Sequence, residues 1–177
     1  TNEQYAIERR QEILDSPARP INPSYLELSF SNVCNFGCSY CSPGQSSKWE
    51  NEVRKYGSYP VEDPTVHKDK MHEMILEDEN PYIDAFWKWW PELYNHLETF
   101  RITGGEPLLS KDTFDILDYI INAEKPNKDL NLCINTNLSA PKNIFDNFVD
   151  KIDRILDKEL VHEFIIFTSC DAWGKQA

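Results

Sequence analysis

Apolar residues recur along this chain with two different periods, and segments of the two kinds alternate. Short segments rich in β-branched or aromatic residues, each bounded by turn or polar residues, predict strands. These segments are 25–30 (YLELSF), 98–103 (ETFRIT), 130–135 (LNLCIN) and 162–169 (HEFIIFTS). Between them, in 83–97, 114–121 and 145–155, apolar residues return every three or four positions, which predicts helices with one apolar face. Strands that alternate with helices indicate βαβ units and a parallel sheet with right-handed crossovers.

Further signals refine this arrangement. Pro91 lies inside the first helical run and predicts a kink or a restart there. Ser110 is placed to cap the second run, and Pro141 suits the first turn of the third. Residues 46–56 predict a further short helix. We expect a polar N-terminal extension over 1–23 and one α/β core over 24–177, with a polar insertion at about 49–80 that lies over the first crossover.

Composition narrows the functional classes. The chain has 177 residues, a net charge of −12, 40% hydrophobic and 27% charged residues, which is typical of a globular protein. No run of 18 apolar residues exists, and the polar N-terminus lacks the features of a signal peptide. The acidic balance disfavours an extensive nucleic-acid surface. Five cysteines, three of them clustered, indicate metal binding in a reducing, cytoplasmic environment rather than a disulfide framework.

Residues that can bind ligands or take part in catalysis follow all four predicted strands. Cys34, Cys38 and Cys41, spaced C-x3-C-x2-C, follow the first strand. The other strand ends carry Gly104-Gly105-Glu106-Pro107, Thr136-Asn137 and Ser169-Cys170-Asp171. In βα architectures the carboxyl ends of parallel strands form the site, so we expect one site built from four loops. Three soft thiolates at one of these ends favour an iron–sulfur cluster or zinc.

The cysteine motif, with an aromatic residue (Tyr40) before its last cysteine and "GGEP" after the second strand, resembles the radical S-adenosylmethionine (radical SAM) superfamily. The stretches "CNFGC", "SSKW", "RITGGEPLL" and "INTNL" are similar to members that carry SPASM or twitch extensions. The resemblance covers roughly residue 24 to the end. It implies a partial (β/α)6 barrel of which about the first four βα units are present, with the core truncated after the fourth strand.

The resemblance also implies cofactors and roles. Cys34, Cys38 and Cys41 would hold a [4Fe–4S] cluster, and S-adenosylmethionine would take the open iron. The residues that would contact this cofactor are Tyr40, Gly104, Gly105, Glu106, Thr136, Asn137, Ser169 and Asp171. An electron donor such as flavodoxin or ferredoxin would reduce the cluster. Reductive cleavage of S-adenosylmethionine would then start hydrogen abstraction from a substrate. We expect a peptide or protein as this substrate first, with a small molecule or nucleoside as the alternative.

Simpler interpretations stay open at each position. The three cysteines suit a structural zinc site in a non-enzymatic module, although no second C-x2-C supplies further ligands. A cluster-binding chain that no longer turns over is a third hypothesis. Glu106 suits the N-terminus of a helix, Thr136 and Asn137 suit capping, and Ser169 and Asp171 suit a turn. Cys133 and Cys170 are expected in the core.

Overall fold

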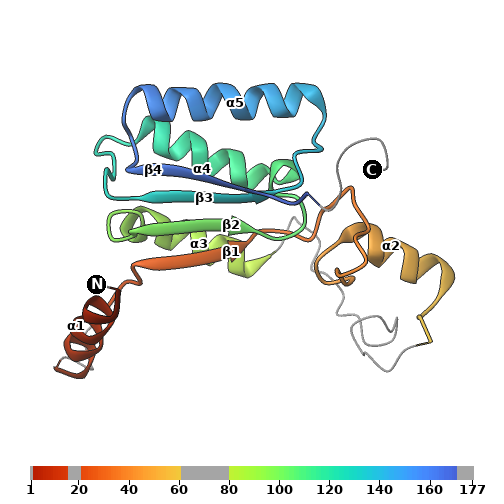
Figure 1. The fold of residues 1–177 in the computed structure, drawn as a ribbon, viewed down its shortest axis with the longest axis horizontal. Helices are drawn as coiled ribbons and strands as arrows, with labels where there is room; N and C mark the ends of the chain where they lie inside the picture. Colours follow the sequence, from red (N-terminus) through yellow and green to blue (C-terminus); the bar gives the residue numbers. More distant parts are fainter. Residues whose placement is uncertain (1, 16–20, 61–79, 171–177) are drawn as a thin grey trace.

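The core of the molecule is a parallel sheet of four strands, in the order β1-β2-β3-β4 (Figure 1). The computed structural model describes residues 2–15, 21–60 and 80–170. The strands are β1 (Tyr25–Ser29), β2 (Thr99–Thr103), β3 (Asn131–Thr136) and β4 (Glu163–Thr168). Each pairs in parallel with the next along the chain. The predicted α/β class with four parallel strands is confirmed.

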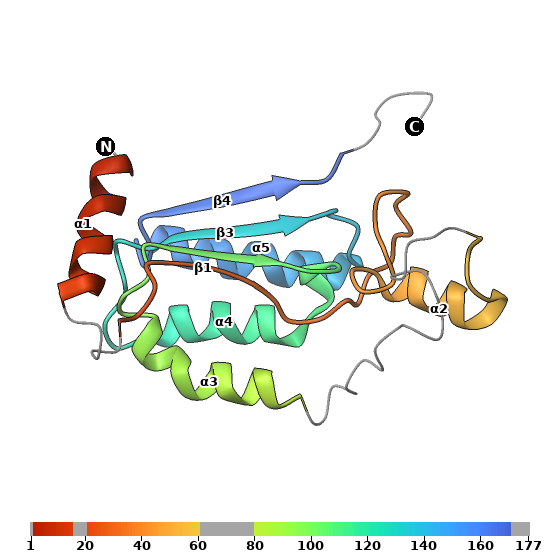
Figure 2. The same ribbon diagram turned by 90° about the horizontal axis from the view of Figure 1, so that it is seen from below.

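Three helices cover one face of the sheet, as Figure 2 shows. They are α3 (Pro81–Leu93), α4 (Lys111–Asn122), which follows the 3-10 helix η3 (Pro107–Leu109), and α5 (Lys142–Asp157). The other two helices lie beyond the ends of the strands. Helix α1 (Asn2–Asp15) lies near the amino ends, and α2 (Ser47–Tyr56) lies past the carboxyl ends. No helix of the described segments covers the other face of the sheet.

The hydrophobic core fills the space between the sheet and these three helices. Phe100 and Ile102 of β2 and Leu132 and Ile134 of β3 are fully buried on this side. Trp90 of α3 packs on Phe100, with 4.8 Å between ring centroids. Because side chains of a strand alternate between faces, the intervening residues point to the uncovered face.

The helical runs differ from the prediction in detail. Helix α3 continues through Pro91 without a restart and ends two residues later, at Leu93. Ser110 is at the N-cap of α4, but its side chain makes no capping hydrogen bond. Pro141 is the N-cap of α5 rather than a residue of its first turn. The short helix expected over 46–56 is present as α2.

The polar insertion predicted at about 49–80 falls partly on α2 and partly on residues 61–79, which lie outside the described residues. No helix in the described portion of the chain has the length and apolar character needed to cross a membrane.

Candidate functional site

The cysteine loop, defined here as residues 30–46, connects β1 to α2 at the carboxyl edge of the sheet (Figure 1). None of the three motif cysteines, Cys34, Cys38 and Cys41, is in a disulfide, and all three are of intermediate exposure. The Cys41 N–H donates to the Cys38 carbonyl at 3.0 Å, which closes a turn between the last two cysteines. The Sγ of Cys34 accepts a weak hydrogen bond from the Phe36 N–H at 3.4 Å.

The two glycines of the "GGEP" segment allow the cysteine loop to come very close to the end of β2. A Cβ added to Gly104, whose φ is +118°, would lie 2.4 Å from Ser29 Oγ and 2.7 Å from the Ser31 carbonyl oxygen. A Cβ added to Gly105 would lie 2.3 Å from the Val33 carbonyl oxygen. Glycine is therefore needed at both positions because the cysteine loop fills the space that a side chain would take, a reason that sequence reasoning missed. Their contact with a cofactor stays a prediction.

Backbone hydrogen bonds hold these two loops together. The Gly105 N–H donates to the Ser31 carbonyl at 3.1 Å, and the Glu106 N–H donates to the Val33 carbonyl at 2.7 Å. The second of these bonds ends one residue before Cys34. The position of the cysteine motif is thus set by the end of the second strand as well as by the first.

Glu106 is a buried carboxylate, 1% exposed, with hydrogen bonds from two directions. One oxygen accepts from the Leu108 N–H at 3.0 Å and from the Thr136 hydroxyl at 2.5 Å. The other accepts from the Asn137 N–H at 2.7 Å. Glu106 caps η3, as the simpler interpretation expected, and it also ties the end of β2 to the end of β3. A contact between Glu106 and a cofactor ammonium stays a prediction.

Thr136 and Asn137 join the same network. Thr136 is 2% exposed, and its hydroxyl oxygen also accepts from the Leu138 N–H at 2.9 Å. Asn137 donates through Nδ2 to the Asn35 Oδ1 at 3.0 Å, and Asn35 donates to the Ser139 carbonyl at 2.7 Å. Asn35 lies between the first two cysteines, so the end of β3 touches the motif directly. Sequence reasoning missed Asn35, because nothing in a lone polar loop residue indicates a partner a hundred positions away.

The remaining predicted site residues are Tyr40, Ser169 and Asp171. Tyr40 is 64% exposed on the cysteine loop. Ser169 is exposed after β4, and its N–H donates to the Thr136 carbonyl at 3.0 Å, which places it beside the same edge. Asp171 lies outside the described residues. The expectation that Cys170 is a core residue is wrong, because Cys170 is exposed beyond the end of β4.

The uncovered face of the sheet carries a charged group that the sequence analysis did not single out. Arg101 of β2 donates through Nε to Asn135 Oδ1 at 2.9 Å, and its guanidinium lies 4.5 Å from the centroid of the Phe167 ring. The Glu27 carboxylate is 3.8 Å from the same Nε. Cys133, paired with Arg101 in the sheet, is buried as predicted. Burial raises the pKa of the Cys133 thiol, and the Arg101 charge partly opposes the rise.

The donor set suits an iron–sulfur cluster. Three thiols on one loop are partly exposed and free of disulfides, and three thiolates leave one position of a four-iron cluster open for another molecule. In the described part of the chain, no three His, Cys, Asp or Glu side chains are grouped so that they could hold a metal ion. Closing the ligand set therefore requires the thiol side chains to turn toward one another.

Comparison with known proteins agrees with this site. The family model of the radical SAM superfamily matches residues 28–162. A GTP 3',8-cyclase of Nautilia profundicola is 30% identical over 125 residues, which are 71% of this chain and 30% of that protein. A GTP 3',8-cyclase of Nostoc sp. is 27% identical over 142 residues, 79% of this chain and 36% of that protein. This chain thus spans about a third of the length of the curated relatives it matches. No solved structure matches it significantly.

The chain belongs to the radical SAM superfamily, a class of enzymes that use a [4Fe–4S] cluster and S-adenosylmethionine. The expected likeness to SPASM or twitch members is not shown by these matches, whose named proteins are GTP 3',8-cyclases.

Proposed function

We propose that Cys34, Cys38 and Cys41 hold a [4Fe–4S] cluster and that this chain carries out the reductive cleavage of S-adenosylmethionine. When bound and reduced, the cluster supplies the electron that splits the cofactor into methionine and a 5′-deoxyadenosyl radical. The observation that supports this most strongly is the joining of three strand ends at one edge. The "GGEP" segment and the Thr136-Asn137 segment both bond to the cysteine loop or to each other.

The residues of the chain have distinct parts in this proposal. The hydrogen bond between Glu106 and Asn137 would position the strand ends beside which the cofactor lies, and Tyr40, which is exposed on the loop, would pack against its adenine. Because the cleavage consumes one electron, an external donor of the flavodoxin or ferredoxin class is part of the proposal. The likeness to members with twitch or SPASM extensions stays a prediction.

For the substrate we favour a small anionic molecule, with a nucleotide as the class named in the relatives, over the peptide expected first. Arg101 supports this choice. It is the single Lys or Arg within the four strands, and it lies on the sheet face that no described helix covers. Its Nε is engaged by Asn135, while its terminal nitrogens have no hydrogen-bond partner among the described residues. A guanidinium with free donors on an open face suits a phosphate or carboxylate.

Anaerobic reconstitution with iron and sulfide tests the cofactor proposal. We expect a [4Fe–4S] electron paramagnetic resonance signal after reduction, a change of that signal on adding S-adenosylmethionine, and formation of 5′-deoxyadenosine. Cys38→Ala should abolish all three, and Cys133→Ala, which removes a cysteine outside the motif, should leave them intact. Tight binding of one zinc ion with no cluster would overturn the proposal and favour a structural module.

Equilibrium binding tests the substrate class. GTP should bind the reconstituted protein more tightly than guanosine, and Arg101→Gln should remove most of that difference. Equal affinity for GTP and guanosine in the unchanged protein would refute a phosphate contact at Arg101.

A further inference from the structure

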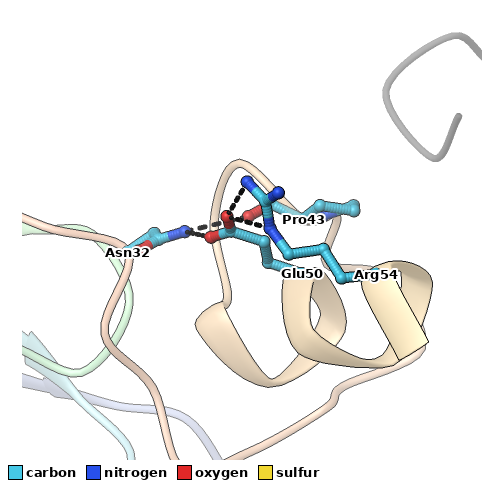
Figure 3. A network of polar contacts seen from close by, with 4 residues as sticks. All are labelled: Asn32, Pro43, Glu50 and Arg54. Carbon is cyan, nitrogen blue, oxygen red and sulfur yellow. Dashed lines mark hydrogen bonds and ion pairs between the residues drawn. The ribbon is translucent and has the colours of Figure 1, made fainter. Parts of the chain in front are cut away.

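Asn32 joins the two ends of the cysteine loop, as Figure 3 shows. It lies two residues before Cys34 and is 7% exposed. Its amide Nδ2 donates to the Pro43 carbonyl at 3.1 Å, two residues after Cys41, and to Glu50 Oε2 at 2.8 Å. Its own backbone carbonyl accepts from the Ser47 N–H at 2.7 Å. One buried side chain therefore spans all three cysteines and fastens both ends of their loop to α2.

Glu50 fixes the orientation of the Asn32 amide. It lies in the first turn of α2, where a carboxylate is favoured by the helix dipole, and its side chain is 13% exposed. One oxygen accepts from Asn32, and the other accepts from Arg54 Nε at 2.9 Å and Nη2 at 2.8 Å (Figure 3). Arg54 thus balances the charge of a carboxylate that would otherwise be costly to desolvate beside the loop.

The first turn of α2 also bonds directly to two of the cysteines. Ser47 Oγ accepts from the Cys34 N–H at 3.0 Å. Trp49 Nε1 donates to the Cys38 carbonyl at 2.8 Å. Ser46, which is fully buried, donates to the Phe36 carbonyl between them at 2.7 Å. These bonds are made by backbone groups of the motif and not by its thiol groups.

We propose that Asn32 and Glu50 are positioning residues that fold the cysteine loop onto α2 before any cluster is present. Ordering a flexible loop costs conformational entropy, and a loop that is already ordered binds its ligand more tightly. The loop therefore exists as a shaped backbone in the metal-free chain, and cluster binding needs little more than rotation of three side chains. The part of this proposal that concerns cluster retention rests on the proposed function, while the part that concerns the metal-free loop does not.

Amide hydrogen exchange of the metal-free chain tests the first part. In Asn32→Ala the Pro43 carbonyl and the Glu50 carboxylate both lose a donor, and peptides covering 33–49 should exchange on the order of tenfold faster. Glu50→Gln should accelerate the same peptides less, because its amide oxygen can still accept from Asn32 and only the bonds from the more exposed Arg54 are then lost.

Two matched variants separate loop ordering from general destabilisation. Asn127 also donates through Nδ2 to two carbonyls, those of Tyr94 and Leu97, far from the cysteine loop. Asn127→Ala should accelerate exchange near those residues and leave 33–49 unchanged. Asp146 of α5 forms an exposed i,i+4 pair with Lys142, so Asp146→Asn is the control for Glu50→Gln. Equal exchange over 33–49 in Asn32→Ala, Glu50→Gln and the unchanged chain would overturn the inference.

Iron loss from the reconstituted protein tests the second part. With a strong ferrous chelator in excess, Asn32→Ala should lose iron several-fold faster than the unchanged protein and Asn127→Ala, and its reduced cluster should give a broadened resonance. If the unchanged protein takes up no iron and sulfide, the proposed function fails while the exchange experiment still decides the role of Asn32. If it loads and Asn32→Ala matches it in both exchange and iron retention, this inference fails and the proposed function stands.

Discussion

Replacing Glu106 with glutamine keeps the size of the side chain and removes its charge, at the point where two strand ends are joined. In the structure the carboxylate accepts three hydrogen bonds, from the Leu108 N–H, the Thr136 hydroxyl and the Asn137 N–H. An amide has a single acceptor oxygen. If the amide NH2 replaces the oxygen that accepts from Asn137, it faces the Asn137 N–H. If it replaces the other oxygen, it faces the Leu108 N–H. Either orientation leaves a backbone donor unpaired.

The expected cost follows from these bonds. Leaving a buried donor unsatisfied costs about 1–3 kcal/mol, and the remaining bonds weaken because charged acceptors bind more strongly than neutral ones. Together, we expect Glu106→Gln to lower the free energy of unfolding by about 2–4 kcal/mol. This is a large fraction of the total stability of a domain, which is about 5–15 kcal/mol.

Urea unfolding at neutral pH, followed by far-UV circular dichroism, measures this change. Glu124→Gln is the control, because Glu124 is exposed two residues after the end of α4. A double-mutant cycle with Thr136→Val should give a coupling energy of about 1 kcal/mol or more, since the two side chains share a buried hydrogen bond. A cost below about 0.5 kcal/mol, no larger than a typical surface substitution, would show that the carboxylate does not join the two strand ends.

Three further changes test the framework around the site. Glu159 follows α5 with a φ of +52°, so Glu159→Gly should raise the free energy of unfolding by about 1 kcal/mol, while Lys158→Gly, at a φ of −94°, should lower it. Burial raises the pKa of the Cys133 thiol in the folded chain. Above the ordinary cysteine pKa of about 8.5 the unfolded chain therefore loses this proton first, and the free energy of unfolding falls as pH rises. Cys133→Ala should flatten that fall in urea titrations between about pH 7 and 9.5. Phe100 is fully buried against Trp90, so Phe100→Ala should cost about 3–5 kcal/mol in the same assay, and a cost near 1 would contradict the described core.

The strands were predictable because each carries its own local signal. The four apolar segments matched the observed strands within two residues at each end, since β-branched and aromatic residues favour a half-buried extended chain wherever they lie. Pro91 and Pro141 predicted the limits of the helices less well. Pro91 lacks the N–H that a helix interior needs, yet α3 passes through it and ends two residues later.

The site was predictable in its position and not in its connections. Parallel strands place all their carboxyl ends at one edge, so the sequence order of the motifs was enough to bring Cys34 and Glu106 near one another. The partners of Glu106 depend on which side chains fill the space between two strands. No local pattern gives the bond from Asn137 to Asn35, or the link from Asn32 to Glu50. The same limit applies to Gly104 and Gly105, because the neighbouring backbone that excludes a side chain there comes from a distant part of the sequence.

The polar residues of this edge fall into a connected series. Glu50 holds Asn32, Asn32 holds the cysteine loop, the loop bonds to the backbone of Glu106, and the Glu106 carboxylate holds Asn137. Each link uses a buried or half-buried polar group, which is costly unless it is fully bonded, so these groups favour one arrangement of three loops over many. Two of the best-buried polar residues here, Asn32 and Glu106, thus bond to the chain itself. We therefore expect that cofactor recognition in the proposed site depends strongly on backbone groups and on the more exposed side chains of the loop, and that the buried network sets the positions of both.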